Sequence, residues 1–226
     1  MSHLIVAVDT ETTGLPGRSP AGSVRIMQLG YVVLRLDPAT GKWARLFEYD
    51  RLLRLDPGTA VDPASQRIHG LDAARCDAEG DTLEAALAGL VGWLDPGPSV
   101  SEPFSPLLVG HNLDFDLGML AQEARRLGRE DWLRALGTVA TACTMEMGRE
   151  VCRLPRPFRA SGFKNPKLAE LFAHLFGGET GLGPLRNLHS AIVDARVCAA
   201  CFLSLAKGVR GSEARGAVGL VDVDQL

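Results

Sequence analysis

The stretch of sequence that decides the fold runs from Leu4 to Gly14 and reads LIVAVDTETTG. Its apolar residues predict a buried β-strand, and the glycine at its end predicts a turn. Successive side chains of a strand alternate between its two faces, so Asp9 and Glu11 are expected to project on the same side, close together. Two such carboxylates repel each other unless a cation lies between them. A hard divalent ion such as Mg²⁺ suits this pair, and a solvated strand end is the alternative.

Two later segments repeat the combination of an apolar run and a polar cluster. The run Leu107–Val109 leads into GHNLDFD at residues 110–116, and residues 188–196 read LHSAIVDAR at the start of the last helical pattern. Each segment offers carboxylates at the end of an apolar element. The sequence therefore predicts a site that is assembled from distant parts of one chain.

In these segments the sequence resembles the DEDDh group of 3′→5′ exonucleases, the DnaQ-like family that includes the proofreading epsilon subunit of bacterial DNA polymerase III. The resemblance covers roughly residues 4–206, with four motifs in order. They are Asp9-Thr-Glu11 followed by Thr-Thr-Gly, Ile68-His69-Gly70, His111-Asn112 with Phe115-Asp116, and His189 five residues before Asp194. One departure is that the segment Thr141–Thr144 has no acid where many relatives carry an Asp-Thr pair, which favours a stand-alone relative over the replicase subunit itself.

The resemblance implies a catalytic set and a cofactor. Two Mg²⁺ or Mn²⁺ ions per active site would be held by four carboxylates, and a histidine would act as general base. The implied ligands are Asp9, Glu11, Asp116 and Asp194, and the implied base is His189. Two residues five positions apart inside one helix would point about 140° away from each other. We therefore expect His189 in the loop or at the cap before the helix that carries Asp194.

The assignment of the third carboxylate has a local competitor. Asp114 and Asp116 are both available, and the resemblance selects Asp116, which directly follows Phe115. Asp114 or Asn112 could instead cap the helix, a common role for these residue types. For His111 we expect a structural hydrogen-bonding role.

The resemblance also implies residues that contact the terminal nucleotide. They are Thr12 and Thr13 for the 3′-hydroxyl, Leu15 against the last base, His69 lining the nucleotide pocket, and Phe115. The local alternatives are turn capping for the threonines and a helix-end position for the histidine.

Composition and periodicity predict one α/β domain. The chain has 226 residues, of which 46% are hydrophobic, and a formal net charge of −3. Strands are expected at 4–9, 25–36, 43–55, 107–110 and 139–142, and helices at 62–68, 82–94, 115–127, 131–136, 166–176 and 190–207. This order predicts a mixed sheet with helices on both faces, which is the five-stranded ribonuclease H-like architecture of the resembled family. We expect an exonuclease domain over residues 1–207 and a glycine-rich tail over residues 208–226.

One segment is strongly basic within this acidic chain. Residues 149–167 contain six Lys and Arg residues and one acid, Glu150, and their prolines disfavour a regular helix. The segment is either a solvated loop or an arm that contacts the phosphates of a bound strand. Phe158 and Phe163 could stack on bases or could anchor the loop to the body.

The remaining features bound the cellular setting. Five cysteines in mostly apolar surroundings do not form a disulfide framework, and Cys198 and Cys201 are expected in the core. No stretch is long enough for a membrane span, and the N-terminal apolar run is too short for a signal peptide, so we expect a cytoplasmic protein with no membrane partner.

The function expected from the sequence is hydrolysis of phosphodiester bonds at single-stranded 3′ ends, releasing nucleoside 5′-monophosphates, in DNA repair or proofreading. The first alternative is an RNA-trimming enzyme of the oligoribonuclease type. The second is a non-catalytic module that binds a polymerase or sliding clamp, and the tail could make such a contact in either case.

Overall fold

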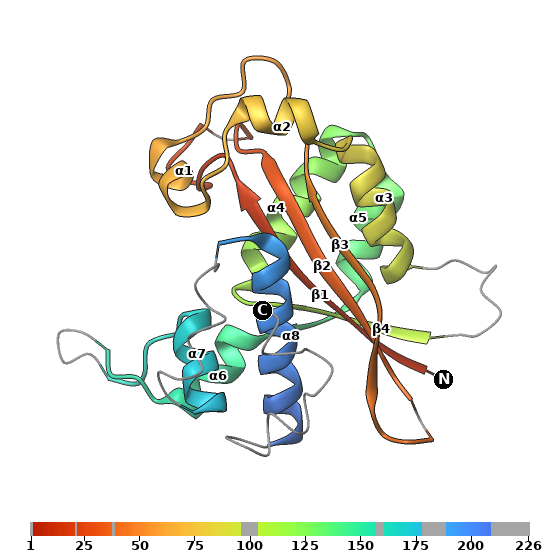
Figure 1. Cartoon of the computed structure of the whole chain (residues 1–226), viewed down its shortest axis with the longest axis vertical. Coiled ribbons are helices and arrows are strands. Elements are labelled where there is room, and N and C mark those ends of the chain that lie inside the picture. The colour runs from red at the N-terminus through yellow and green to blue at the C-terminus, as the bar shows by residue number, and fades with distance from the viewer. Residues whose placement is uncertain are drawn as a thin grey trace.

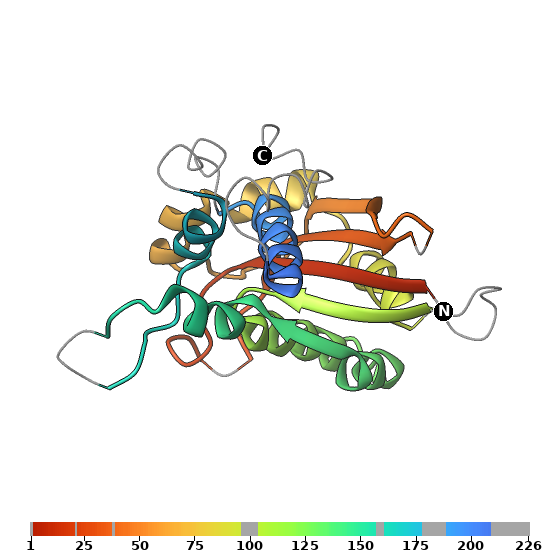
Figure 2. The same cartoon turned by 90° about the horizontal axis from the view of Figure 1, so that it is seen from below.

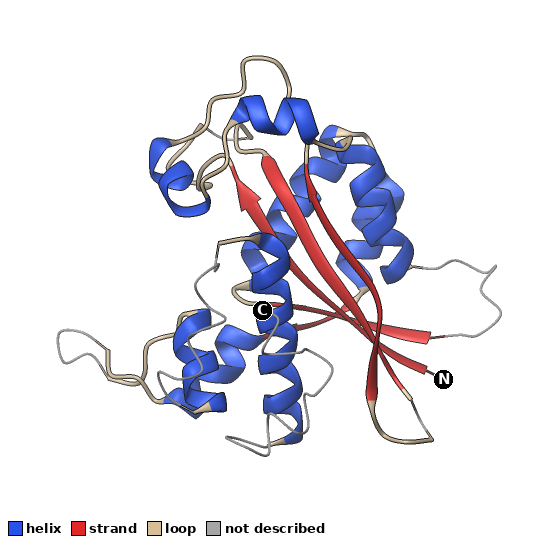
Figure 3. Ribbon diagram, viewed as in Figure 1, coloured by secondary structure: helices blue, strands red, loops and turns tan. Residues whose placement is uncertain are grey.

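The protein is built around a central five-stranded sheet that is covered by helices on both faces (Figure 1, Figure 2 and Figure 3). The computed structural model describes residues 2–20, 22–37, 39–95, 104–156, 161–177 and 189–208. The strand order is β3-β2-β1-β4-β5. The strands are β1 (Ser2–Thr12), β2 (Ile26–Leu36), β3 (Trp43–Leu52), β4 (Phe104–Gly110) and β5 (Ala140–Cys143).

The sheet is mixed, as the sequence predicts. β1 pairs with β2 and β2 with β3 in antiparallel fashion, whereas β4 lies parallel to both β1 and β5. All five predicted strands are present, although β4 begins at Phe104, three residues before the predicted start at Leu107. The proline and serine residues before Leu107 concealed this beginning, because these residue types favour loops.

The alternation of side chains along β1 divides the core into two layers. Leu4, Val6 and Val8 pack on one face with the helices α3 (Leu83–Leu94), α4 (Leu113–Arg126) and α5 (Glu130–Thr138). Ile5 and Ala7 pack on the other face with α7 (Leu168–Phe176) and α8 (Ala191–Lys207). Asp9 and Glu11 continue the second series, so their side chains belong to the α8 face of the sheet.

Most helices begin and end close to the predicted positions. Asp62 and Thr82 cap α1 (Pro63–His69) and α3 by accepting hydrogen bonds from backbone N–H groups of the first turn. The helices α2 (Ala73–Glu79) and α6 (Thr144–Cys152) were not predicted. α2 buries only Cys76 and so has no apolar stripe, and α6 ends before the prolines of the basic segment begin.

The first turn of α8 lies directly on β2. Gly30 is paired with Asp9 across the two strands, and a Cβ built on Gly30 would lie 2.3 Å from the backbone carbon of Ala191 and from the backbone nitrogen of Ile192. Only a glycine leaves room for this approach. The sequence alone does not single out Gly30, because its role depends on a helix about 160 residues away in the chain.

The remaining predictions about the body concern the cysteines, a membrane span and the C-terminal tail. Cys198 and Cys201 are buried in α8, and all five cysteines are free. No helix in the described part of the chain is long and apolar enough to cross a membrane. α8 ends at Gly208 in the left-handed conformation, and the predicted tail beyond it lies outside the described residues.

We predict that Gly30→Ala lowers the free energy of unfolding by about 1–3 kcal/mol, the usual range for overpacking, because the added methyl group pushes against the α8 backbone. Urea denaturation followed by circular dichroism measures this change. Gly92→Ala is the matched control, since Gly92 is exposed in α3 with nothing near its Cβ position and alanine favours a helix there. Equal stability of the two variants would contradict the close approach.

Candidate active site

The carboxyl end of β1 extends past its parallel neighbour. The last paired residues of β1 and β4 are Ala7 and Val109, so Asp9 and Glu11 lie beyond the end of the parallel ladder while still paired with β2. Both side chains are half-buried. The two acids therefore project at an edge of the sheet where helices from both layers can reach them, which is the arrangement expected for a site in a parallel α/β sheet.

Asp116 reaches this edge from the opposite layer. It lies in the first turn of α4, is 2% exposed, and its Oδ1 accepts a 2.7 Å hydrogen bond from the hydroxyl of Thr10. Thr10 points toward α4 because it lies between Asp9 and Glu11 on the other face of β1. The sequence analysis did not assign a role to Thr10. Its position between Asp9 and Glu11, with its side chain on the opposite face of β1, was the signal that it could bind a third carboxylate on that face.

Asp194 is brought to the same place by α8. The Oε1 of Gln28, which is paired with Glu11 across the strands, accepts a hydrogen bond from the backbone N–H of Ala191 at 3.2 Å. One turn further, Arg196 makes a two-fold hydrogen bond to the carboxylate of Glu48 in β3, at 3.0 and 2.7 Å. The sequence signal for the first contact was a buried glutamine in an otherwise apolar strand, because a buried polar side chain needs a partner.

His189 lies immediately before α8, where the sequence analysis placed it. Its side chain is exposed, and its backbone has φ 83°, an unusual value for a residue other than glycine. Its backbone N–H donates to Oδ2 of Asp194 at 3.4 Å. One potential ligand atom each from Glu11, His189 and Asp194 lies within 4.8 Å of the other two.

The two acids in the first turn of α4 differ in burial. Asp114 is exposed in the first turn of α4, whereas Asp116 is buried against Thr10. Asn112 occupies the N-cap position with φ 65°, but its side chain makes no capping hydrogen bond. Asn112 is thus the N-cap residue by position, as one of the two expectations had it, but its side chain does not supply the capping hydrogen bond.

His111 has the structural role expected for it. Its Nδ1 lies 3.0 Å from the hydroxyl of Thr144, and its Nε2 donates to the carbonyl oxygen of Pro166 at 3.0 Å. Burial lowers the pKa of His111, which keeps the ring neutral. The ring thus ties the end of β4 to the segment before α7.

The residues expected to contact a terminal nucleotide lie around the loop after β1. The hydroxyl of Thr12 donates to the carbonyl oxygen of Gly14, and the hydroxyl oxygen of Thr13 accepts the backbone N–H of Arg25, so both side chains are engaged within the loop. Leu15 is 42% exposed at the tip of this loop. Phe115, in the first turn of α4, is half-buried and packs against the core.

His69 faces the same space as His189. Its Nδ1 accepts the backbone N–H of Leu71 at 3.0 Å, so the protonated Nε2 donates to the carbonyl oxygen of Thr12 at 3.2 Å. His69 and His189 line one cavity of about 420 Å³ together with Gln28, Arg51 and Arg75. The end of α1 is thereby fixed to the loop that follows the two acids of β1.

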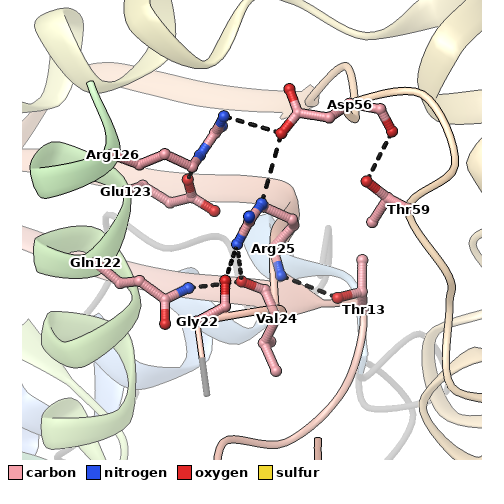
Figure 4. A network of polar contacts seen from close by, with 9 residues as sticks. All are labelled: Thr13, Gly22, Val24, Arg25, Asp56, Thr59, Gln122, Glu123 and Arg126. Atoms are coloured by element: carbon pink, nitrogen blue, oxygen red, sulfur yellow. Dashed lines mark hydrogen bonds and ion pairs between the residues drawn. The ribbon is translucent and has the colours of Figure 1, made fainter. Parts of the chain in front are cut away.

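A network of charged and polar side chains ties this loop to α4 (Figure 4). Asp56 accepts from Arg126 of α4 at 2.9 Å and lies 3.6 Å from Arg25, and Arg126 also pairs with the buried Glu123 at 2.7 Å. Gln122 donates to the carbonyl oxygen of Val24 at 2.6 Å. The helix that carries Asp116 and the segments that carry Leu15 and His69 therefore hold one another in place.

The electrostatics of the carboxylate cluster are unfavourable without a counter-charge. Burial, then the charges of Asp116, Asp194 and Glu11, raise the pKa of Asp9 well above its usual range. Burial, then Asp194 and Asp116, raise the pKa of Glu11 to about 8. Burial also raises the pKa of Asp116 to about 7, against the lowering effect of the Thr10 hydrogen bond, and raises the pKa of Asp194 to about 6. The four groups are close enough for each to disfavour the ionisation of another.

The donor set fits a hard divalent cation. Oδ1 of Asp194 is buried and has no hydrogen-bond partner among the described residues, although a buried carboxylate oxygen ordinarily has one. The neighbouring groups are carboxylates and one imidazole, and oxygen ligands of this kind bind Mg²⁺ and Mn²⁺. A cation at this place would provide the missing partner and offset the repulsion.

The RNase T exonuclease family model matches residues 6–202, which include all the residues of this cluster. The chain belongs to this exonuclease family. No curated protein sequence gives a significant match to the chain.

Several solved structures share the fold of this exonuclease. E. coli Exonuclease I in complex with a dA16 oligonucleotide has a TM-score of 0.62 and 17% identity, with 94% of this chain and 42% of that chain covered. The zinc-bound form of the E. coli enzyme with single-stranded DNA gives 0.63 and 16%, covering 92% and 40%. The product-bound form of exonuclease I gives 0.62 and 16%, covering 98% and 45%. The chain thus spans less than half the length of these proteins, and the likeness confirms the predicted ribonuclease H-like fold.

We predict that the metal-free protein loses stability as the pH rises from 6.5 to 8. Over this range the folded protein still releases protons from Asp116 and Glu11, with pKa values of about 7 and 8, whereas the unfolded carboxyls have already lost theirs. The folded state then binds more protons than the unfolded state, so the free energy of unfolding must fall. The loss should be on the order of 1–3 kcal/mol, since one pKa unit corresponds to about 1.4 kcal/mol.

Urea titrations at several pH values between 6.5 and 8, in buffer that contains a metal chelator, measure this free energy of unfolding. An unfolded histidine titrates near pH 6.5, and the pKa values of His69 and His111 are lowered in the folded protein, so these two rings favour the folded state as the pH rises toward about 7.5. Their contribution opposes that of the carboxyls and is smaller, about 1 kcal/mol or less, so a net loss of stability remains. Glu11→Gln should flatten the pH dependence, and Glu130→Gln, at an exposed position in α5, should leave it unchanged. Stability that rises with pH in the wild type would contradict the clustering of the acids.

Proposed function

We propose that this exonuclease removes nucleotides from single-stranded 3′ ends in the 3′→5′ direction by a two-metal mechanism and releases nucleoside 5′-monophosphates. The observation that carries the proposal is the convergence of Asp9, Glu11, Asp116 and Asp194, with His189 beside them. These carboxylates come from one strand and from two helices on opposite faces of the sheet. A structure that gathers mutually repelling acids from three elements is best explained by a site for cations.

Two Mg²⁺ or Mn²⁺ ions, bound by Asp9, Glu11, Asp116 and Asp194, would supply an activated water and stabilise charge on the phosphoryl and leaving oxygens. The charge of the four carboxylates, −4, balances that of two such ions. Asp9 is proposed to contribute to both positions, because the charges of the other three acids all raise its pKa and it therefore lies near each of them. Thr10 holds Asp116 in one orientation, and the backbone N–H of His189 does the same for Asp194.

His189 is proposed as the general base. It is exposed, precedes the helix of Asp194, and has a ring nitrogen within 4.8 Å of the ligand oxygens of Glu11 and Asp194. An imidazole titrates near neutrality and can accept the proton of the attacking water. Its strained backbone is consistent with a functional constraint at this position.

The terminal nucleotide is proposed to bind between the loop after β1 and the histidine-lined cavity. The exposed side chain of Leu15 offers an apolar surface to a base, and His69 is held by Thr12 at the edge of the cavity that His189 also lines. Phe115 and the Thr12–Thr13 backbone border the same region by their positions beside Asp116 and Glu11. The motifs support the assignment to the DnaQ-like branch. DNA as the substrate and a repair or proofreading role are further parts of this proposal, and RNA trimming is the alternative that matched DNA and RNA strands distinguish.

The carboxylate assignment is tested by two variants at positions two residues apart in the first turn of α4. Asp116→Asn should reduce the shortening of a 5′-labelled single-stranded oligonucleotide by on the order of 100-fold or more, because changes to residues that only support metal ligands already cost 10–100-fold. Asp114→Asn removes the same charge at an exposed position in the same turn and should retain activity close to that of the wild type. Equal activities of the two variants, or release of the 5′ label as a mononucleotide by degradation from the 5′ end, would overturn the proposal. Matched DNA and RNA strands identify the preferred sugar.

Metal binding is tested without turnover. Saturating Mg²⁺ or Mn²⁺ should raise the melting temperature by on the order of 5–10 °C, since a ligand at 100 times its Kd contributes about 2.7 kcal/mol. Asp9→Asn should remove most of this rise, whereas Asp114→Asn should keep it. A wild-type melting curve that is the same with and without divalent cations would count against the metal site.

A further inference from the structure

We propose that a basic arm beside the active site binds the backbone phosphates of the substrate strand upstream of its 3′ end. The arm consists of residues 153–156 and 161–164, which leave the body next to α6 and α7 (Figures 1 and 2). This inference rests on the proposed function and adds to it a second contact surface for single-stranded nucleic acid.

The two halves of the arm form a defined structure. Pro155 and Phe163 form an antiparallel bridge, and the backbone N–H of Lys164 donates to the carbonyl oxygen of Leu154 at 3.0 Å. Arg156 donates from Nε to the carbonyl oxygen of Phe163 at 3.0 Å, and the guanidinium of Arg153 lies 5.9 Å from the Phe163 ring. Phe163 is half-buried and contacts other residues of the arm, whereas Phe158 lies outside the described residues.

The base of the arm is attached at the edge of the sheet where the carboxylates gather. α6 begins directly after β5, whose last residue, Cys143, is paired with Gly110 at the end of β4. The ring of His111, the next residue after Gly110, donates to the carbonyl oxygen of Pro166 just after the arm. The arm and Asp116 are therefore both held by the segment that follows β4.

The charge of the arm is available to a ligand. Lys164 is paired with Glu170 at 2.6 Å, and Arg149 lies 3.7 Å from its neighbour Glu150. In contrast, no carboxylate of the described residues lies within ion-pair distance of Arg153, Arg156 or Lys167, all of which are exposed. Elsewhere in the described chain, arginines such as Arg126 and Arg196 are paired with carboxylates.

A nucleic acid strand needs such a surface in this protein. The chain carries a net charge of −3 and concentrates carboxylates at the proposed catalytic centre, so a polyanion is not attracted by the molecule as a whole. Phosphate contacts by unpaired Arg and Lys side chains provide sequence-independent affinity for single strands. The sugar is not part of this contact, so DNA and RNA backbones offer the same ligand chemistry.

The test compares binding and turnover in the double variant Arg153→Ala/Arg156→Ala. Binding of a fluorescent oligothymidylate of roughly 20 nucleotides is measured by anisotropy in an Asp116→Asn background at several salt concentrations. The slope of log K against log salt should become shallower by about 1.4, because each phosphate contact to a single strand contributes about 0.7. The same measurement with oligouridylate shows whether the contact is common to both backbones.

Turnover separates the arm from the catalytic centre. In the Asp116-containing enzyme, the double variant should raise KM for the long strand by on the order of tenfold and leave kcat nearly unchanged. Hydrolysis of the p-nitrophenyl ester of thymidine 5′-monophosphate, which has no upstream phosphate, should be unchanged. The control Arg125→Ala/Arg134→Ala removes two exposed arginines from α4 and α5, which cover the sheet face opposite to α7 and α8. It should change neither the salt slope of binding nor KM for the long strand.

Two outcomes for the double variant would overturn the arm proposal. The first is a salt slope and a KM that are unchanged for both strands. The second is a loss of activity on the small ester as large as the loss on the long strand, which would indicate a structural role for the two arginines. If the wild-type protein hydrolyses neither substrate, the proposed function fails instead. In that case the binding slopes still decide whether the arm contacts phosphates.

Discussion

The direct packing of the first turn of α8 on β2 is the contact on which the site depends. Gly30 lies opposite Asp9 in the sheet and has no side chain, so the α8 backbone can approach to a distance that a Cβ would forbid. The contact is fixed at one point by Gln28 and at another by Arg196 with Glu48. Without this approach Asp194 could not lie near Asp9, and the carboxylates of β1 would face solvent instead of another helix.

The cost of the arrangement is electrostatic. Burial raises the pKa values of all four acids, and the charges of neighbouring acids raise those of Asp9, Glu11 and Asp116 further, so the surrounding scaffold must hold the cluster together against repulsion. The scaffold does so through two apolar layers that pack independently on the faces of the sheet, so each layer can present a helix terminus to the same edge. Residues in unusual backbone conformations, Asn112 and His189, lie immediately before the two helices that carry Asp116 and Asp194.

The proposed substrate contacts divide into two regions with different chemistry. The carboxylate cluster, with His69 and His189 beside it, suits one phosphodiester and one nucleotide. The basic arm suits backbone phosphates further along a strand and carries its unpaired charge on Arg153 and Arg156. Both regions are attached to the segment that runs from the end of β4 into the first turn of α4, which contains His111 and Asp116. A displacement of this segment would therefore affect both.

The sequence by itself determined the fold class, the order of strands and most helices, and the identity of the clustered acids. Apolar runs mark the strands and helices, and the two-residue alternation along a strand puts Asp9 and Glu11 on one side. Asp116 and Asp194 were singled out by the family resemblance of their motifs. The helices α2 and α6 were missed because α2 buries only Cys76 and α6 adjoins a proline-containing segment, so neither presents a clear apolar stripe.

Only the tertiary structure decided how the acids are held. Thr10, Gln28 and Gly30 act on partners that are 100 or more residues away in the chain, and no periodicity or spacing in a single sequence encodes such pairs. The sequence separated Asp114 from Asp116 only by family resemblance, whereas the structure shows that Asp116 is buried against Thr10 and that Asp114 is exposed. The availability of Arg153 and Arg156 likewise depended on which carboxylates lie near them in space, because a count of charges along the chain does not show which ones are paired.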